Sequence, residues 1–167
     1  MDLRYEIKFK SQVYNYFEII SLIKSSKIYN FKECFKRRIV NSIYLDTVSF
    51  QSYFDSINGN QNRNKFRLRW YGNNDLIKSN LEIKRKFGSV GNKSLFVFDP
   101  FHFSMPFNRN IFKILINSNK ELDINLKNYL LKLIPNVLVS YERRYFISND
   151  SNLRITIDRN INYSYIS

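Results

Sequence analysis

The hydrophobic and polar positions along the chain follow two periods. Residues 3–10 alternate strictly between apolar and charged side chains, which predicts a β-strand. Residues 12–24 carry apolar side chains at near-helical spacing, which predicts a helix with Ser11 as its N-cap. The same patterns predict strands at residues 39–46, 65–71, 80–86, 94–98, 137–146 and 153–163, and helices at residues 49–56, 110–116 and 122–133. This order of elements predicts an α+β fold with a largely antiparallel sheet.

Several of the predicted strands have one apolar and one cationic face. In residues 65–71, Arg67 and Arg69 lie on one face, whereas Phe66 and Trp70 lie on the other. The polar faces of the other strands carry Glu82, Lys84 and Lys86, then Arg154 and Asp158, and finally either Arg143 or Arg144. At least four strands therefore repeat the same division.

The arginines on these faces indicate an anionic ligand. Like charges on adjacent strands repel one another, and a bound anion relieves that repulsion. If the sheet closes into a barrel with its polar face inward, the interior becomes a cationic tunnel that suits phosphate groups. An open sheet with one solvated face is the alternative. The nearby acids are candidates either for a divalent cation or for structural salt bridges, and they are Glu6, Asp46, Glu82 and Asp158.

Composition adds a strong positive charge to this picture. The chain has 167 residues, with 27 Lys and Arg against 14 Asp and Glu, which gives a formal net charge of +13. Hydrophobic residues make up 44% of the chain, which is enough for the core of one domain and argues against a disordered basic tail. The richness in Asn, Lys, Ile, Tyr and Phe also explains scattered surface lysines, but it does not explain arginines placed regularly within strands.

Rare residues exclude several classes of site. Cys34 is the one cysteine, which excludes an internal disulfide and a cysteine-based zinc site, and His102 is the one histidine, which excludes multi-histidine metal sites. Four glycines and no glycine-rich loop argue against a P-loop nucleotide site. No apolar run reaches the roughly 18 residues of a membrane span, and the N-terminus has no signal-peptide pattern, so a cytoplasmic location is expected.

Six segments, taken in order, resemble the VTC (vacuolar transporter chaperone) domain, a branch of the CYTH-like triphosphate tunnel metalloenzymes. The segment KFRLRWY at residues 65–71 is the most distinctive of them. The others are RYEIK at residues 4–8, SIYLDT at 42–47, LEIKRK at 81–86, VSYERRY at 139–145 and LRITIDR at 153–159. The resemblance extends from the first predicted strand to the last and covers residues 1–167 as one domain.

The resemblance implies an antiparallel β-barrel that forms a tunnel, with a few flanking helices. It implies a transferase that makes inorganic polyphosphate from ATP with a divalent metal, Mn²⁺ or Mg²⁺. The phosphate-binding residues that it implies are Lys8, Arg67, Arg69, Lys84, Lys86, Arg143 and Arg154, and it favours Arg143 over Arg144. Of these, the catalytic set is Arg67, Arg69, Lys84, Arg143 and Arg154.

The family pattern continues into a Leu-Glu-x-Lys strand that has no counterpart here. We therefore expect a C-terminally truncated domain with an incomplete barrel, whose main metal-binding Glu would lie beyond Ser167. Glu6 and Glu82 are the remaining candidates for metal ligands.

Two alternatives stay open at this point. A non-catalytic polyphosphate-binding module would share the cationic lining without turnover. A basic nucleic-acid-binding domain would place aromatic rings between cations on one exposed face. Phe66 and Trp70 oppose the cations, which disfavours nucleic acid, whereas Tyr44, Tyr71 and Tyr141 lie on polar faces. A membrane partner or a fused domain is also left open.

Overall fold

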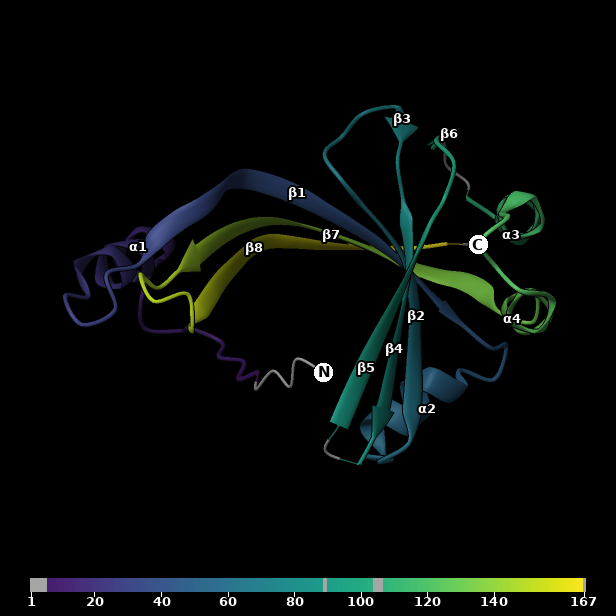
Figure 1. Ribbon diagram of the computed structural model, residues 1–167, viewed down its shortest axis with the longest axis horizontal. Helices are drawn as coiled ribbons and strands as arrows, with labels where there is room; N and C mark the ends of the chain where they lie inside the picture. The colour runs from purple at the N-terminus through teal and green to yellow at the C-terminus, as the bar shows by residue number, and fades with distance from the viewer. Residues whose placement is uncertain (1–5, 89, 104–106, 167) are drawn as a thin grey trace. The chain divides into compact units, whose positions relative to one another are not determined.

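The computed structural model describes residues 6–88, 90–103 and 107–166. Within these residues the chain is an α+β fold with four helices and a six-stranded antiparallel sheet (Figure 1). The helices are α1 (Tyr16–Ser25), α2 (Gln51–Ile57), α3 (Arg109–Ser118) and α4 (Ile124–Leu130). The strands are β1 (Lys32–Asp46), β2 (Arg63–Tyr71), β3 (Leu76–Ile77), β4 (Asn80–Phe87), β5 (Val90–Val97), β6 (Phe101–His102), β7 (Ile134–Ile147) and β8 (Arg154–Tyr165).

The large sheet has the strand order β5-β4-β2-β1-β7-β8, and β3 and β6 form a separate pair. The α+β class and the antiparallel sheet are confirmed. Among the described residues the sheet is open and does not close into a barrel, with β5 and β8 as its edge strands. None of the described helices has the length and apolar character that a membrane crossing requires.

The chain divides into two compact units. Unit 1 comprises Met1–Ile39 and Tyr141–Ile161, and unit 2 comprises Val40–Ser140 and Asn162–Ser167. Strands β1, β7 and β8 each contribute residues to both units.

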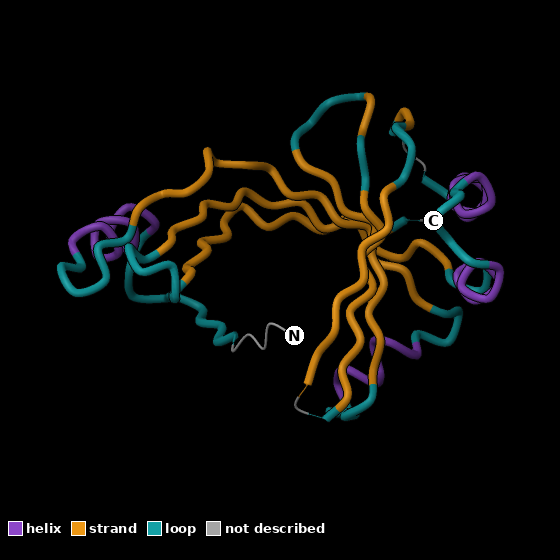
Figure 2. The backbone as a smooth tube through the Cα atoms, viewed as in Figure 1, coloured by secondary structure: helices purple, strands orange, loops and turns teal. Residues whose placement is uncertain are grey.

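In unit 2, the apolar faces of β2 and β4 form the centre of a core. Phe66, Leu68 and Trp70 alternate along β2 and are buried, as the sequence pattern predicts. Phe112 and Ile116 lie four residues apart on α3 and pack into the same cluster. Figure 2 shows β2, β4 and β5 running side by side, in agreement with their antiparallel pairing. One face of these strands is therefore covered by the core, and their other face is left for polar side chains.

In unit 1, α1 packs on a smaller core. Ile20 and Ile23 are buried against Phe31 and Phe146. The helix begins after Asn15, whose side chain accepts hydrogen bonds from the backbone N–H groups of Phe17 and Glu18. The Glu18 carboxylate accepts from the Asn15 N–H at 2.8 Å and completes a capping box.

Two predictions at the N-terminus are wrong. Residues 6–10 are not a strand, and residues 3–5 of that prediction lie outside the described residues. Alternation alone does not make a strand, because a strand needs a partner for its backbone groups. The first helix begins at Tyr16 with Asn15 as its N-cap, not at residue 12 with Ser11, because the capping box fixes the boundary.

Other boundaries shift by a few residues. β1 begins at Lys32 instead of residue 39, because its polar first half has no alternation to mark it. β5 begins at Val90 instead of residue 94, and α4 is confined to Ile124–Leu130 within the predicted 122–133.

Candidate functional site

The polar side of unit 2 gathers cations from three neighbouring strands. In the strand register, Arg67 lies opposite Glu82, and Lys65 lies opposite Lys84, which in turn lies opposite Lys93. Residues opposite one another across antiparallel strands share a face of the sheet. The basic face is defined here by Lys65, Arg67, Arg69, Lys84, Lys86 and Lys93.

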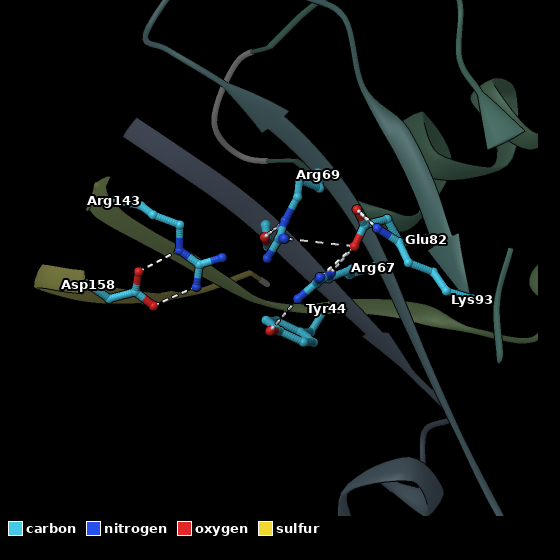
Figure 3. Close-up of polar contacts among 8 residues, drawn as sticks. Tyr44, Arg67, Arg69, Glu82, Lys93, Arg143 and Asp158 are labelled. Atoms are coloured by element: carbon cyan, nitrogen blue, oxygen red, sulfur yellow. Dashed lines mark hydrogen bonds and ion pairs between the residues drawn. The ribbon is translucent and has the colours of Figure 1, made fainter. Parts of the chain in front are cut away.

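Glu82 lies at the centre of the basic face and is only 4% exposed. Its Oε2 atom accepts from Arg67, at 2.7 Å from Nε and 2.5 Å from Nη2. Its Oε1 atom accepts from Lys93 Nζ at 2.8 Å, and Arg69 Nη1 lies 3.9 Å from Oε2 (Figure 3). One carboxylate thus holds three cations that come from two different strands.

Strand β1, which neighbours β2 on the side away from β4, also contacts Arg67 and Arg69. Tyr44 Oη lies 3.3 Å from Arg67 Nη1, and Ser42 Oγ accepts from Arg69 Nε at 3.1 Å. Both arginines are therefore held at defined positions on the sheet. Rigid donors of this kind favour the binding of phosphate oxygens in a fixed geometry.

Burial and charge act in opposite directions on the pKa values at this centre. Burial disfavours the charged form of Glu82, but the hydrogen bond from Lys93 and the charge of Arg67 outweigh it and lower its pKa. Burial likewise opposes the charge of Arg67, and the attraction of Glu82 outweighs it and raises the Arg67 pKa. Both groups stay charged at neutral pH.

The basic face has far more positive than negative charge. Asp46, at the end of β1, is another acid of unit 2. Its carboxylate accepts hydrogen bonds from the backbone N–H groups of Thr47, Ser52 and Tyr53, around the beginning of α2. The basic face therefore has six cations, and three of them pair with Glu82. This excess is the electrostatic requirement for a polyanion site.

Unit 1 holds a second set of the predicted cations. Arg143 makes a bidentate ion pair with Asp158, at 2.5 Å from Nε and 2.6 Å from Nη2 (Figure 3). Burial opposes the charged form of Arg143, whereas the hydrogen bonds to Asp158 raise its pKa. Its guanidinium carbon lies 5.0 Å from the centre of the Tyr141 ring. The arginine is thereby held in one orientation.

The neighbouring Arg144 points to the other side of β7. It makes a bidentate pair with Glu33 and shares a face with Phe146, which is buried under α1. The sequence alternation left Arg143 and Arg144 equivalent, and the structure separates them: only Arg143 lies on the face away from α1. Arg154, at the beginning of β8, is exposed.

The structure thus divides the predicted site residues between the two units. Arg67, Arg69, Lys84, Lys86 and Glu82 come together in unit 2. Unit 1 contains Arg143 and Arg154, and also Lys8 and Glu6, which lie 3.8 Å apart on a mostly exposed segment outside any strand.

Lys93 is the member of the basic face that the sequence did not reveal. The predicted strand began one residue after it, so its face could not be assigned. Lys93 lies opposite Lys84 in the hairpin of β4 and β5. Pairing the residues outward from the turn of this hairpin would have placed Lys93 on the same face as Lys84.

The contacts of Glu82 favour ion pairs with side chains over a resident metal ion. Both oxygens of Glu82 already accept from cations, and a divalent ion there would meet three positive side chains. Within residues 6–88, 90–103 and 107–166, no three His, Cys, Asp or Glu side chains group in a way that could hold a metal. Glu82 therefore fits the role of orienting cations, and the metal-binding roles of Glu6 and Glu82 stay predictions.

An open antiparallel sheet with one apolar and one cationic face is consistent with a partial tunnel fold. The family model of the VTC domain matches residues 3–166, and the chain belongs to this family, which is part of the CYTH-like superfamily. The family is linked to polyphosphate polymerase activity in general. A search of curated proteins finds no match to the chain.

Proposed function

We propose that the basic face binds a linear chain of phosphates, and that the domain serves the synthesis of polyphosphate from ATP. The observation that carries this proposal is the set of six cations on the basic face, three of which pair with Glu82. The family membership supports phosphate chains over other polyanions.

Each residue has a distinct part in this proposal. Arg67 and Arg69 are held by Glu82, Tyr44 and Ser42, so their guanidinium charges have fixed positions on the basic face, and the proposal assigns to them the attraction of phosphate oxygens. The lysines at the periphery are more exposed and can adjust to the position of the chain. Arg143 and Arg154, in unit 1, are further candidates for phosphate ligands.

The proposed reaction is a phosphoryl transfer. The bond between the γ-phosphorus and the bridging oxygen of ATP breaks, a bond from that phosphorus to a terminal oxygen of polyphosphate forms, and ADP leaves. Such a reaction requires in-line positioning and stabilisation of charge on the transferred oxygens, which fixed guanidinium groups provide. The proposal assigns that positioning to Arg67 and Arg69.

The first experiment measures binding of tripolyphosphate by titration calorimetry. Lys84→Ala removes an exposed cation of the basic face, and Arg85→Ala removes the next residue of β4, which is exposed on the opposite face. We expect Lys84→Ala to weaken binding and to flatten its salt dependence, with Arg85→Ala close to the wild type. Equal affinities in the two variants would contradict the proposed face.

The second experiment separates synthesis from binding alone. Release of ADP from ATP, with polyphosphate present, is measured with and without Mn²⁺ or Mg²⁺. Turnover supports the polymerase, whereas tripolyphosphate binding without turnover under any of these conditions overturns the catalytic part and leaves a polyphosphate-binding module.

A further inference from the structure

Unit 1 contains a pocket of about 600 Å³, and none of its lining residues belongs to the basic face of unit 2. The first turn of α1 forms one side of it, and residues of β1, β7 and β8 form the rest. The lining residues are Tyr16, Phe17, Glu33, Phe35, Lys36, Arg37, Arg144 and Arg159. The pocket is open to solvent, and its volume lies within the range of about 300–1,000 Å³ that is common for ligand pockets.

The pocket has a positive charge balance. Arg144 pairs with Glu33, and Arg159 pairs with Glu142 at 3.0 Å. Arg37 lies 3.3 Å from the same Glu142 carboxylate, so two arginines share one acid. Lys36 adds a further exposed cation. Four cations thus meet two carboxylates, which leaves the pocket attractive to an anion.

Both carboxylates remain ionised at neutral pH, so the balance holds under ordinary conditions. The hydrogen bond from Arg144 lowers the pKa of Glu33, and the hydrogen bond from Arg159 lowers the pKa of Glu142. The side chain of Arg37 is 59% exposed, so its donors can turn toward a ligand.

The pocket also has aromatic walls that are partly exposed to solvent. Phe17 is 75% exposed and meets the edge of the Tyr16 ring at 5.3 Å between ring centres. Phe35 is 45% exposed, and the Arg38 guanidinium lies over its ring with the guanidinium carbon 4.3 Å from the ring centre. The Arg159 guanidinium already stacks on Tyr16, with its carbon 4.0 Å from the ring centre. Flat rings and flat cations of this kind stack on other flat groups.

From this combination we propose that the pocket binds a nucleotide. The base stacks on Phe17, with Phe35 as a neighbouring wall, and the phosphate lies near Lys36 and Arg37. A ligand with only a phosphate would leave the aromatic walls uncovered, and a neutral aromatic compound would leave the excess positive charge unmatched. The site shares no lining residue with the basic face, and the proposal does not depend on the function of that face.

The test compares AMP, adenosine and ribose 5-phosphate by titration calorimetry with the full chain. We expect AMP to bind more tightly than either fragment. Phe17→Ala should weaken AMP binding by about 5- to 150-fold, which is the effect of losing a base–aromatic stack. The matched control is Leu22→Ala, an exposed apolar residue of the same helix outside the pocket, and it should bind AMP as the wild type does.

The charged half of the site has its own pair of variants. Arg37→Ala should weaken AMP but leave adenosine unchanged, and Lys32→Ala, an exposed cation of β1 outside the pocket, should change neither. Equal binding of AMP and ribose 5-phosphate, or wild-type AMP binding by Phe17→Ala, would overturn the proposal. Loss of AMP binding in Lys84→Ala but not in Phe17→Ala would place the nucleotide on the basic face and overturn it as well.

Discussion

The substitution Glu82→Gln tests how much the negative charge of Glu82 stabilises the cations of the basic face. Glutamine keeps the shape of the side chain and one acceptor oxygen but removes the negative charge. The side chain of Arg67 is only 13% exposed, so it would keep its charge in a poorly solvated position without a counterion. At the 3.9 Å between Arg69 Nη1 and Glu82 Oε2, the attraction between unit charges is about 4 kcal/mol at an effective dielectric constant of 20.

The net destabilisation is smaller than the sum of such attractions, because burying the carboxylate opposes them. Removing one partner of a buried ion pair costs about 3–5 kcal/mol. We expect the low end, about 3 kcal/mol, because the glutamine side chain retains one acceptor and Lys93 can move into water. For a chain of this length, that corresponds to a fall in Tm of roughly 6–12 °C.

Denaturant unfolding followed by tryptophan fluorescence measures this loss of stability in unit 2, which contains Glu82. Trp70 is the one tryptophan of the chain, is 4% exposed and lies on β2 in the core of unit 2. The control is Asp99→Asn, which removes the same charge from an exposed residue of the same unit. It should leave the free energy of unfolding close to that of the wild type.

The ligand provides the second half of the test. Tripolyphosphate supplies negative charge to the arginines that Glu82→Gln leaves without a counterion, so it should stabilise this variant more than the wild type. At 100 times its Kd, a ligand stabilises a protein by about 2.7 kcal/mol. If Glu82→Gln unfolds like the wild type, or if tripolyphosphate stabilises both proteins equally, Glu82 does not organise the face as argued.

Two further predictions concern pH and the first helix. Because the folded protein lowers the pKa of Glu82 from its ordinary value of 4.5, ionised Glu82 stabilises the folded state at pH values above 4.5, and this contribution is lost as the pH falls through the folded-state pKa. When the free energy of unfolding is measured against pH, it should therefore fall less steeply toward acid in Glu82→Gln than in the wild type. Identical profiles would contradict this prediction. Asn15→Ala removes the N-cap of α1 and should destabilise unit 1 by about 0.5–2 kcal/mol. Hydrogen exchange at the Phe17 and Glu18 amides should accelerate, and unchanged exchange would show that the cap does not stabilise the helix.

The alternation along β2 was sufficient to predict which side of that strand enters the core. Phe66 and Trp70 are buried because their shared parity places them together, and Arg67 falls on the other face for the same reason. A period of two needs no knowledge of the partner strand. The position of Glu82 beside Arg67 does depend on the partner, because it requires the register of β2 against β4.

Features that depend on residues distant in the sequence could not be predicted from alternation. The alternation of residues 6–10 is as regular as that of β2, yet these residues are not a strand. Lys93 and Arg143 show the same limit: the position of Lys93 depends on the β4–β5 turn, and only the packing of Phe146 under α1 distinguishes Arg143 from Arg144. The pocket of unit 1 combines residues from four elements and left no signal in the sequence.

The row formed by Lys65, Lys84 and Lys93 crosses three adjacent strands at one level of the sheet. Neighbouring strands lie only about 4.8 Å apart, so this row is a dense line of like charge that attracts small anions from solution. A phosphate chain that binds there displaces those anions into bulk solvent. Their gain in translational freedom favours binding, so the entropy of released counterions, in addition to new hydrogen bonds, would drive the capture of a polyanion.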